Sequence, residues 1–193
     1  GPIDMNNGMF DLRQGHTTRV DESQPVPSTL VSEAARTLIA FSGVTILPDI
    51  PEYYRKYPAL LNFLSAQKMP WKESRTLAGE IGEYIVMMRE TEDAYLVGAA
   101  TNESGRTIDL PLSFLEKGKY TVEVIEDGDD AHYLTNRESL KVTTWQLTNN
   151  DKLALKLAPG GGACLVIKKT PSMRVGEQAA FPLVSPFWKI GRE

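Results

Sequence analysis

Cysteine and histidine are scarce in this chain. Cys164 is the single cysteine among 193 residues, so no disulfide can form within the chain. It sits in an apolar run, and we expect it to be a buried core residue. The two histidines, His16 and His132, lie far apart and lack the spacing of a metal site. The sequence therefore predicts neither a disulfide-stapled scaffold nor a histidine-based site.

Long apolar runs and an excess of positive charge are also missing. No run approaches the ~18 apolar residues that a membrane helix needs, and no signal peptide is evident. The net charge of −4 gives no electrostatic reason to bind nucleic acid or an anionic membrane. Apolar residues make up 41% of the chain, which is enough for a core. Because the chain starts at Gly1-Pro2 without a methionine, we expect a processed or excised piece.

The first third of the sequence has helical periodicity. Leu30, Ala34 and Leu38 belong to an apolar stripe that predicts a helix over residues 29–42, capped by Ser28 or Thr29. The run Val44–Leu47 is typical of a strand buried on both faces. Asp49 and Glu52 resemble a capping box for a second helix, which Pro58 interrupts and which continues to about Gln67. Helix, buried strand and helix form half of an α/β repeat.

Residues 82–169 have the pattern of an all-β domain. Two apolar runs, Tyr84–Met88 and Tyr95–Ala100, flank a charged break and predict adjacent antiparallel strands. Later segments alternate between apolar and polar residues with a period of two, which indicates one buried face. Seven or so short strands with glycine and asparagine turns favour a sandwich or a Greek-key sheet. The further strands are expected at Thr107–Leu112, Lys119–Glu126, Leu140–Leu147, Lys152–Leu157 and Ala163–Lys168.

Several short motifs suggest sites, and each has a simpler structural explanation. Asp127–Asp130 starts like a calcium loop, but Ala131 and His132 stand where that loop needs an oxygen ligand and a glycine, which favours a solvated turn. Gly160–Gly162 is followed by neither a lysine-serine pair nor a helix, so a tight turn into the last strand is expected. Glu80 and Glu83 are weak candidates for an acid/base pair. The tryptophans could stack on sugars, although a core role is favoured for each: Trp71, Trp145 and Trp188.

The order of the motifs carries a resemblance. Met69–Arg75 precedes Gly79–Tyr84 and an apolar strand, and Leu96–Asn102, Gly118–Tyr120 and Ala158–Gly162 follow. In this order they resemble glycoside hydrolase family 97, which includes bacterial α-glucosidases and α-galactosidases and shows "W-D-E-[ST]" followed by "G-x-x-GEY". Lys72 replaces the usual acid after the tryptophan. At the start, Gly1–Gly8 resembles the family's "GPMDYTPG" loop but departs from it at Met5-Asn6-Asn7.

The resemblance runs from residue 1 to about 169 and implies an architecture. Family members have an N-terminal β-sandwich, a central (β/α)8 barrel and a C-terminal β domain. Residues 1–70 would then be the last part of the barrel, residues 71–169 the C-terminal β-sandwich domain and residues 170–193 an irregular tail. The expected fold class is an α/β remnant of a (β/α)8 barrel followed by an all-β antiparallel, sandwich-like domain.

The resemblance also implies where the chemistry lies. The family's catalytic acid and its calcium-binding glutamates belong to motifs upstream of the "GPMD" loop, so we expect calcium only in the full-length enzyme. No catalytic residue, metal ligand or bound cofactor is expected in this chain. Asp4 and Asp49 are the candidate substrate-binding residues, because both would lie at the sugar end of the barrel. For Asp49 the alternative is a helix cap, which we favour. The family suggests a periplasmic or secreted location.

We therefore expect the C-terminal part of an exo-acting α-glycosidase that acts on α-linked oligosaccharides, inactive in isolation. Its β domain would pack on the barrel and stabilise it. Uncovered, the Leu30/Ala34/Leu38 stripe and the Val44–Leu47 strand would be open to water, so self-association, the Phe181–Trp188 tail or local disorder would have to hide them. A free-standing carbohydrate-binding module and a purely structural domain are the alternatives. The sequence leaves open glucoside or galactoside, and inversion or retention.

Overall fold

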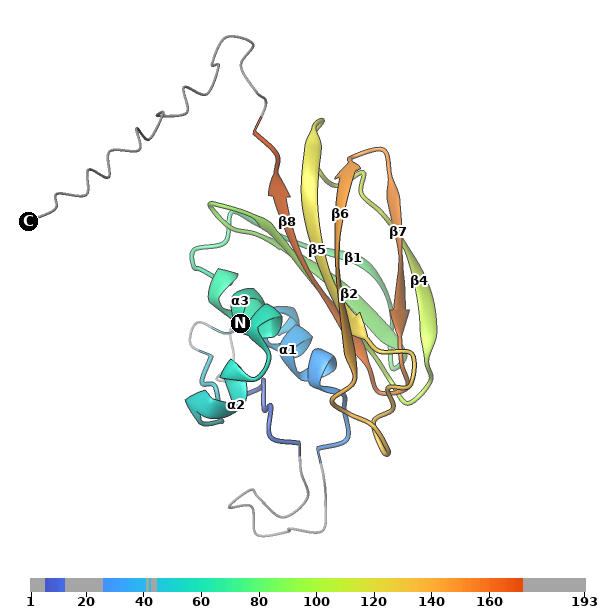
Figure 1. Cartoon of the computed structure of the whole chain (residues 1–193). Helices are drawn as coiled ribbons and strands as arrows, with labels where there is room; N and C mark the ends of the chain where they lie inside the picture. The colour runs from blue at the N-terminus through green and yellow to red at the C-terminus, as the bar shows by residue number, and fades with distance from the viewer. Residues whose placement is uncertain (1–5, 13–25, 41, 43–44, 172–193) are drawn as a thin grey trace, which may run out of the picture.

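The structure is a computed structural model that describes residues 6–12, 26–40, 42 and 45–171. The described chain forms three layers (Figure 1). The first consists of helices α1 (Leu30–Ile39), α2 (Pro51–Arg55) and α3 (Pro58–Ala66). A six-stranded antiparallel sheet forms the middle, and a two-stranded sheet of β4 (Arg106–Pro111) and β7 (Lys152–Leu157) covers its other face.

The six-stranded sheet has the order β1-β2-β3-β8-β5-β6. The predicted pairing of the two apolar runs is confirmed, because β2 and β3 are antiparallel with Tyr84 opposite Thr101 and Glu90 opposite Tyr95. The other predicted strands also form, each within one or two residues of its expected bounds. The strands are β1 (Glu73–Glu80), β2 (Tyr84–Glu90), β3 (Tyr95–Thr101), β5 (Lys119–Asp127), β6 (Leu140–Thr148) and β8 (Gly162–Lys169).

Strand β1 was not expected. It pairs with β2 at the edge of the sheet, and a bulge between Thr76 and Ala78 shifts its register. None of its eight residues is fully buried. A strand of this kind carries no alternation of buried and exposed residues, so its sequence has no period of two that could reveal it.

The described residues form two apolar cores, one on each face of the six-stranded sheet. The first, between the two sheets, contains Val122, Leu155 and Leu165 and is made by strand residues and the β4–β5 connection. The second lies between the helices and the sheet, where Leu38 and Phe63 pack with Leu96 of β3. The predicted alternation in β5 is confirmed: Tyr120, Val122 and Val124 face the first core and Ile125 the second.

Local sequence explains the ends of the helices. Thr29 is the N-cap of α1, and its side-chain oxygen accepts a hydrogen bond from Ser32 N at 3.2 Å, as predicted. Helices α2 and α3 each have a proline in the first turn, where its missing N–H costs no helical hydrogen bond.

Two expectations for residues 29–67 are corrected. The Leu30/Ala34/Leu38 stripe is fully buried, because it packs on the six-stranded sheet. Val44 lies outside the described residues, but the rest of the run expected to be a buried strand forms no strand: Ile46 is 63% exposed and Leu47 40% exposed. The expected barrel remnant is therefore not shown by the described chain, in which the helices pack on the six-stranded sheet.

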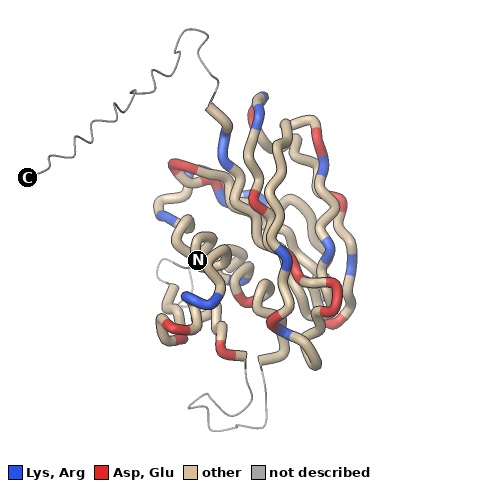
Figure 2. Tube along the Cα trace, viewed as in Figure 1, with Lys and Arg blue, Asp and Glu red and all other residues tan. Residues whose placement is uncertain are grey.

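Charges of both signs are interspersed over the described chain (Figure 2). Most ion pairs join exposed side chains, such as Lys152 with Asp109 at 2.9 Å. No helix among the described residues is long and apolar enough to cross a bilayer.

Candidate functional sites

Asp49 holds the N-terminal segment against the loop before α2. One carboxylate oxygen accepts hydrogen bonds from Phe10 N at 2.9 Å and Asp11 N at 2.6 Å, and the other accepts from Ile50 N at 3.0 Å. Tyr54 completes the cluster, because its hydroxyl donates to Gly8 O at 3.0 Å. Burial, with Asp49 nearby, raises the pKa of the Tyr54 hydroxyl to about 12. Asp49 therefore holds the backbone of residues 10 and 11 against the loop that precedes α2.

Asp49 was also a candidate helix cap. The N-cap of α2 is Ile50, which makes no side-chain cap hydrogen bond, so the predicted capping box is wrong. The physical reason is that the carboxylate of Asp49 is turned toward residues 10 and 11, while Glu52 pairs with Arg55 at 3.6 Å. Asp4 lies outside the described residues, so its relation to Asp49 stays a prediction.

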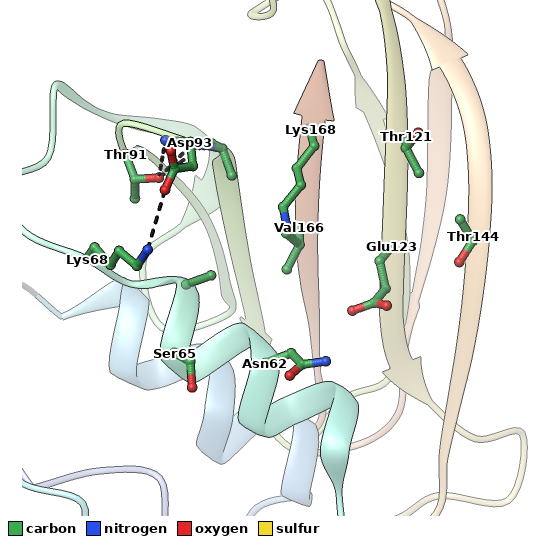
Figure 3. A pocket seen from close by; sticks show the side chains of 12 residues that line it. Asn62, Ser65, Lys68, Thr91, Asp93, Thr121, Glu123, Thr144, Val166 and Lys168 are labelled. Carbon is green, nitrogen blue, oxygen red and sulfur yellow. Dashed lines mark hydrogen bonds and ion pairs between the residues drawn. The ribbon is translucent and has the colours of Figure 1, made fainter. Parts of the chain in front are cut away.

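A groove of about 570 Å³ lies between α3 and the sheet (Figure 3). Asn62 and Ser65 line it from α3, and Glu123 and Thr144 line it from β5 and β6. The ion pair of Lys68 and Asp93, 3.5 Å apart, lies at one end. The lining contains hydrogen-bonding groups and charges of both signs but no aromatic ring on which a sugar could stack. The residues that line the groove come from five separate segments, so no local sequence motif predicts it.

Asp127 is a buried carboxylate at the end of β5. It is 3% exposed, and its Oδ2 accepts from Ala158 N at 3.0 Å and Gly162 N at 2.7 Å. Burial raises the pKa of Asp127 to about 6, against the lowering effect of hydrogen bonds from the Thr29 hydroxyl and the two backbone amides. Its Oδ1 has no hydrogen-bond partner in the described chain. Asp127 therefore ties the 158–162 turn to β5, and the same turn contacts the start of α1, because Thr29 N donates to Gly160 O at 3.1 Å.

This arrangement corrects the prediction for one turn and confirms the prediction for another. A solvated turn was expected at residues 127–130, and Asp129 and Asp130 are exposed, but Asp127 is not. The 160–162 turn does lead into β8, with Gly160 at a φ of +65°, a conformation that favours glycine. Among the described residues no three His, Cys, Asp or Glu side chains are grouped so that they could hold a metal ion, so this part of the chain does not fit a calcium site.

The remaining candidates do not form a site. Glu83 accepts from Arg106 Nη1 at 2.9 Å, and Glu80 is exposed on the edge strand. Trp71 lies under the guanidinium of Arg89, 4.5 Å from its ring centroid, just before β1. Cys164 is fully buried as predicted.

The tryptophans of the described chain do not cluster. Trp71 precedes β1 and Trp145 lies on β6, at opposite edges of the six-stranded sheet. Trp145 is 50% exposed, which corrects the core role favoured for it. His16 and Trp188 lie outside the described residues. A paired aromatic platform for sugar, which a carbohydrate-binding module would need, is therefore not formed by Trp71 and Trp145.

Comparisons with known proteins agree on one family. A family model described as "Glycosyl-hydrolase 97 C-terminal, oligomerisation" matches residues 70–168. The chain is 31% identical over 169 residues to a retaining alpha-galactosidase of Bacteroides thetaiotaomicron, which covers 87% of this chain and 25% of that protein. A probable retaining alpha-galactosidase of Streptomyces bingchenggensis is 27% identical over 130 residues, covering 67% of this chain and 19% of that protein.

Solved structures give the same result. A glycoside hydrolase family 97 enzyme from Pseudoalteromonas sp. strain K8, in complex with acarbose, superposes with a TM-score of 0.81 at 29% identity. The match covers 89% of this chain and 27% of that one. The present chain thus spans about a quarter or less of the length of these relatives.

Proposed function

Because the chain belongs to glycoside hydrolase family 97, we propose that it is the non-catalytic C-terminal part of an exo-acting α-glycoside hydrolase that acts on α-linked oligosaccharides. Residues 70–168 are the family's C-terminal oligomerisation domain. We propose retaining α-galactosidase as the activity of the whole enzyme, since both curated relatives carry that name. The match to the Bacteroides thetaiotaomicron relative along 87% of this chain is the observation that carries the proposal.

The surface beside the helices supports a role in packing on the rest of the enzyme. Three apolar side chains of the 45–50 loop are exposed: Ile46 at 63%, Leu47 at 40% and Ile50 at 54%. We name them the loop patch. Exposed apolar surface of this kind marks a contact with another protein surface. In the whole enzyme the catalytic barrel would cover the loop patch, which is open to water in the described chain.

A retaining enzyme needs two carboxyl groups about 5 Å apart. One protonates the leaving oxygen, and the other attacks the sugar to form a covalent intermediate that water then hydrolyses. We place both outside this chain. Within it, Asp49 would hold residues 8–11 at the end of the barrel, where Asp4 would reach the sugar. The glutamates that bind calcium in the family would also lie outside this chain, and the location would be periplasmic or secreted.

Activity measurements separate this proposal from its alternatives. The 193-residue chain is expected to release no aryl group from aryl α-galactosides or α-glucosides above a protein-free blank. The full reading frame that contains it should hydrolyse the α-galactoside. Turnover by the chain alone that is lost on replacing one of its own acids would overturn the assignment. Binding of melibiose or maltose by the isolated chain, measured by calorimetry, would favour the carbohydrate-binding alternative.

A further inference from the structure

The six-stranded sheet has two edges, which differ in how they are protected. An edge strand presents unpaired N–H and C=O groups, a template on which another strand can form. Natural proteins protect such edges with bulges, charged side chains or proline. On β1 the protection is complete: a bulge lies between Thr76 and Ala78, and the strand carries Glu73, Arg75 and Glu80.

The two strands of the small sheet are protected as well. Strand β4 contains Arg106, Asp109 and Pro111, and β7 contains Lys152 and Lys156. Neither is longer than six residues. These strands are therefore poor templates for a further strand.

Strand β6 has none of these devices. It pairs with β5 over nine residues, Leu140 to Thr148, without a register shift. Its one charged residue is Lys141, whose amine lies 2.9 Å from the carboxylate of Glu126 on β5. Val142 is 42% exposed and Trp145 is 50% exposed. A long, regular, nearly uncharged edge with exposed apolar residues is a template on which another chain can pair.

The side chain of Trp145 is arranged for such a contact. Its indole N–H already donates to the Thr143 hydroxyl at 3.0 Å, so burying the ring would leave no unpaired donor. On β5 its neighbour is Val122, which is fully buried, whereas the ring itself is half open. A tryptophan whose indole N–H is already hydrogen-bonded and whose ring is exposed to solvent is typical of an interface residue.

We propose that β6 is the self-association edge, pairing antiparallel with β6 of a second copy around a two-fold axis near Thr144. The proposal rests on the proposed function, because the family's description as an oligomerisation domain makes a second copy the partner. An antiparallel strand paired with itself satisfies two-fold symmetry and joins the two six-stranded sheets into one continuous sheet. Trp145 of each copy then packs beside Thr143 of the other.

A matched pair of charge substitutions tests the edge. Thr144→Lys places a charge on β6, and Thr76→Lys places the same charge at an exposed position of β1. We expect Thr144→Lys to weaken dimerisation of the 193-residue chain at least tenfold and Thr76→Lys to leave it unchanged, both measured by sedimentation equilibrium. Circular dichroism verifies that each variant is folded. An unmodified chain that is monomeric at all concentrations overturns the proposal.

The loop patch provides the rival interface, and Ile46→Ser with Ile50→Ser tests it. If this double variant dissociates the dimer while Thr144→Lys does not, self-association belongs to the loop patch. That result overturns the β6 edge and leaves the proposed function intact. A dimer that neither substitution weakens also overturns the β6 edge.

Crosslinking tests the symmetry without destabilising the fold. Thr144→Cys should form a disulfide between two copies, because directly opposite residues in an antiparallel pair have Cα atoms about 4.5–5.5 Å apart, within the range for a disulfide. Cys164 is fully buried and should not react. Thr76→Cys is the control. Rapid crosslinking at residue 144 and not at 76 is the expected result; equal or absent crosslinking at the two positions contradicts the proposal.

Discussion

The two faces of the six-stranded sheet are covered by different kinds of layer. On the face toward β4 and β7, the core is made by residues 77–167, within the part that the family model matches. On the other face, the core joins helices from residues 30–66 to strands far along the chain, and it includes buried polar groups such as Ser28, which donates to Glu33 at 2.6 Å. The first core can therefore form without the second, whereas the helices depend on a completed sheet.

The largest effect should come from one matched pair of core truncations. Leu155 and Leu38 are both fully buried, one in each core. Leu155→Ala should lower the free energy of unfolding of the whole β domain by roughly 2–5 kcal/mol. Leu38→Ala should cost a similar amount in the helical layer and leave the unfolding midpoint of the strands nearly unchanged. Urea unfolding followed at helix and at sheet wavelengths of circular dichroism measures both; equal shifts of both signals in both variants would show a single cooperative unit.

The buried Asp127 at the junction of the layers should make stability depend on pH. Its pKa rises from 3.8 to about 6 on folding, so between these values the folded state holds the proton more tightly than the unfolded state. Its contribution is fully present below about pH 4 and is lost as the pH rises through 6, a change of about 3 kcal/mol.

The variant Asp127→Asn isolates this effect, because other carboxylates titrate in both proteins. We expect the difference in unfolding free energy between the original chain and the variant to change by about 2 kcal/mol between pH 4 and pH 7, the original losing stability as the pH rises. Urea midpoints at the two pH values measure it. A difference that is constant with pH would mean that Asp127 is ionised at both.

Gly98 of β3 sets how closely α1 approaches the sheet. A Cβ at this position would lie 2.9 Å from Ala35 O and 3.4 Å from the Leu38 side chain. Gly98→Ala should therefore push α1 away and destabilise the helical layer by roughly 1–3 kcal/mol. Thermal unfolding of the variant measures the loss, and chemical shifts should change in α1 more than in β4 and β7. Unchanged stability would mean that α1 moves freely on the sheet.

The smallest effect is expected at the start of α1. The side-chain oxygen of Thr29 caps the helix by accepting a hydrogen bond from Ser32 N. Thr29→Ala should cost about 1–2 kcal/mol in the helical layer, while Thr29→Ser, which keeps the hydroxyl, should recover most of it. Denaturant midpoints of the two variants give the comparison, and equal losses in both would assign the effect to the methyl group.

The predictability of the fold also differs between the two faces. The period of two in β5 and the paired runs of β2 and β3 follow from local sequence, so these strands were predicted close to their observed bounds. The destination of α1 was not predictable. Its apolar stripe indicates that one face is buried but not against what, and the strand residues packed with it, such as Leu96 and Cys164, lie more than 50 positions later.

The candidate sites were also predictable only as far as local sequence determines them. Asp49 was identified from its place after an apolar run, but its hydrogen bonds to residues 10 and 11 depend on a tertiary contact across 38 positions. The sequence predicts a solvated turn at Asp127, because Ala131 and His132 do not fit a calcium loop. The burial of Asp127 depends on the 158–162 turn, 31 residues away, closing over it.

Native-state amide hydrogen exchange tests the unequal independence of the two layers most directly. In low concentrations of denaturant, amides of α1 and α3 should exchange through an opening of lower free energy than amides of β3, β5 and β8, because the helices can detach while the core between the sheets stays intact. The same opening free energy in α1 and in these three strands would contradict the account, since the helices and both sheets would then unfold as one unit.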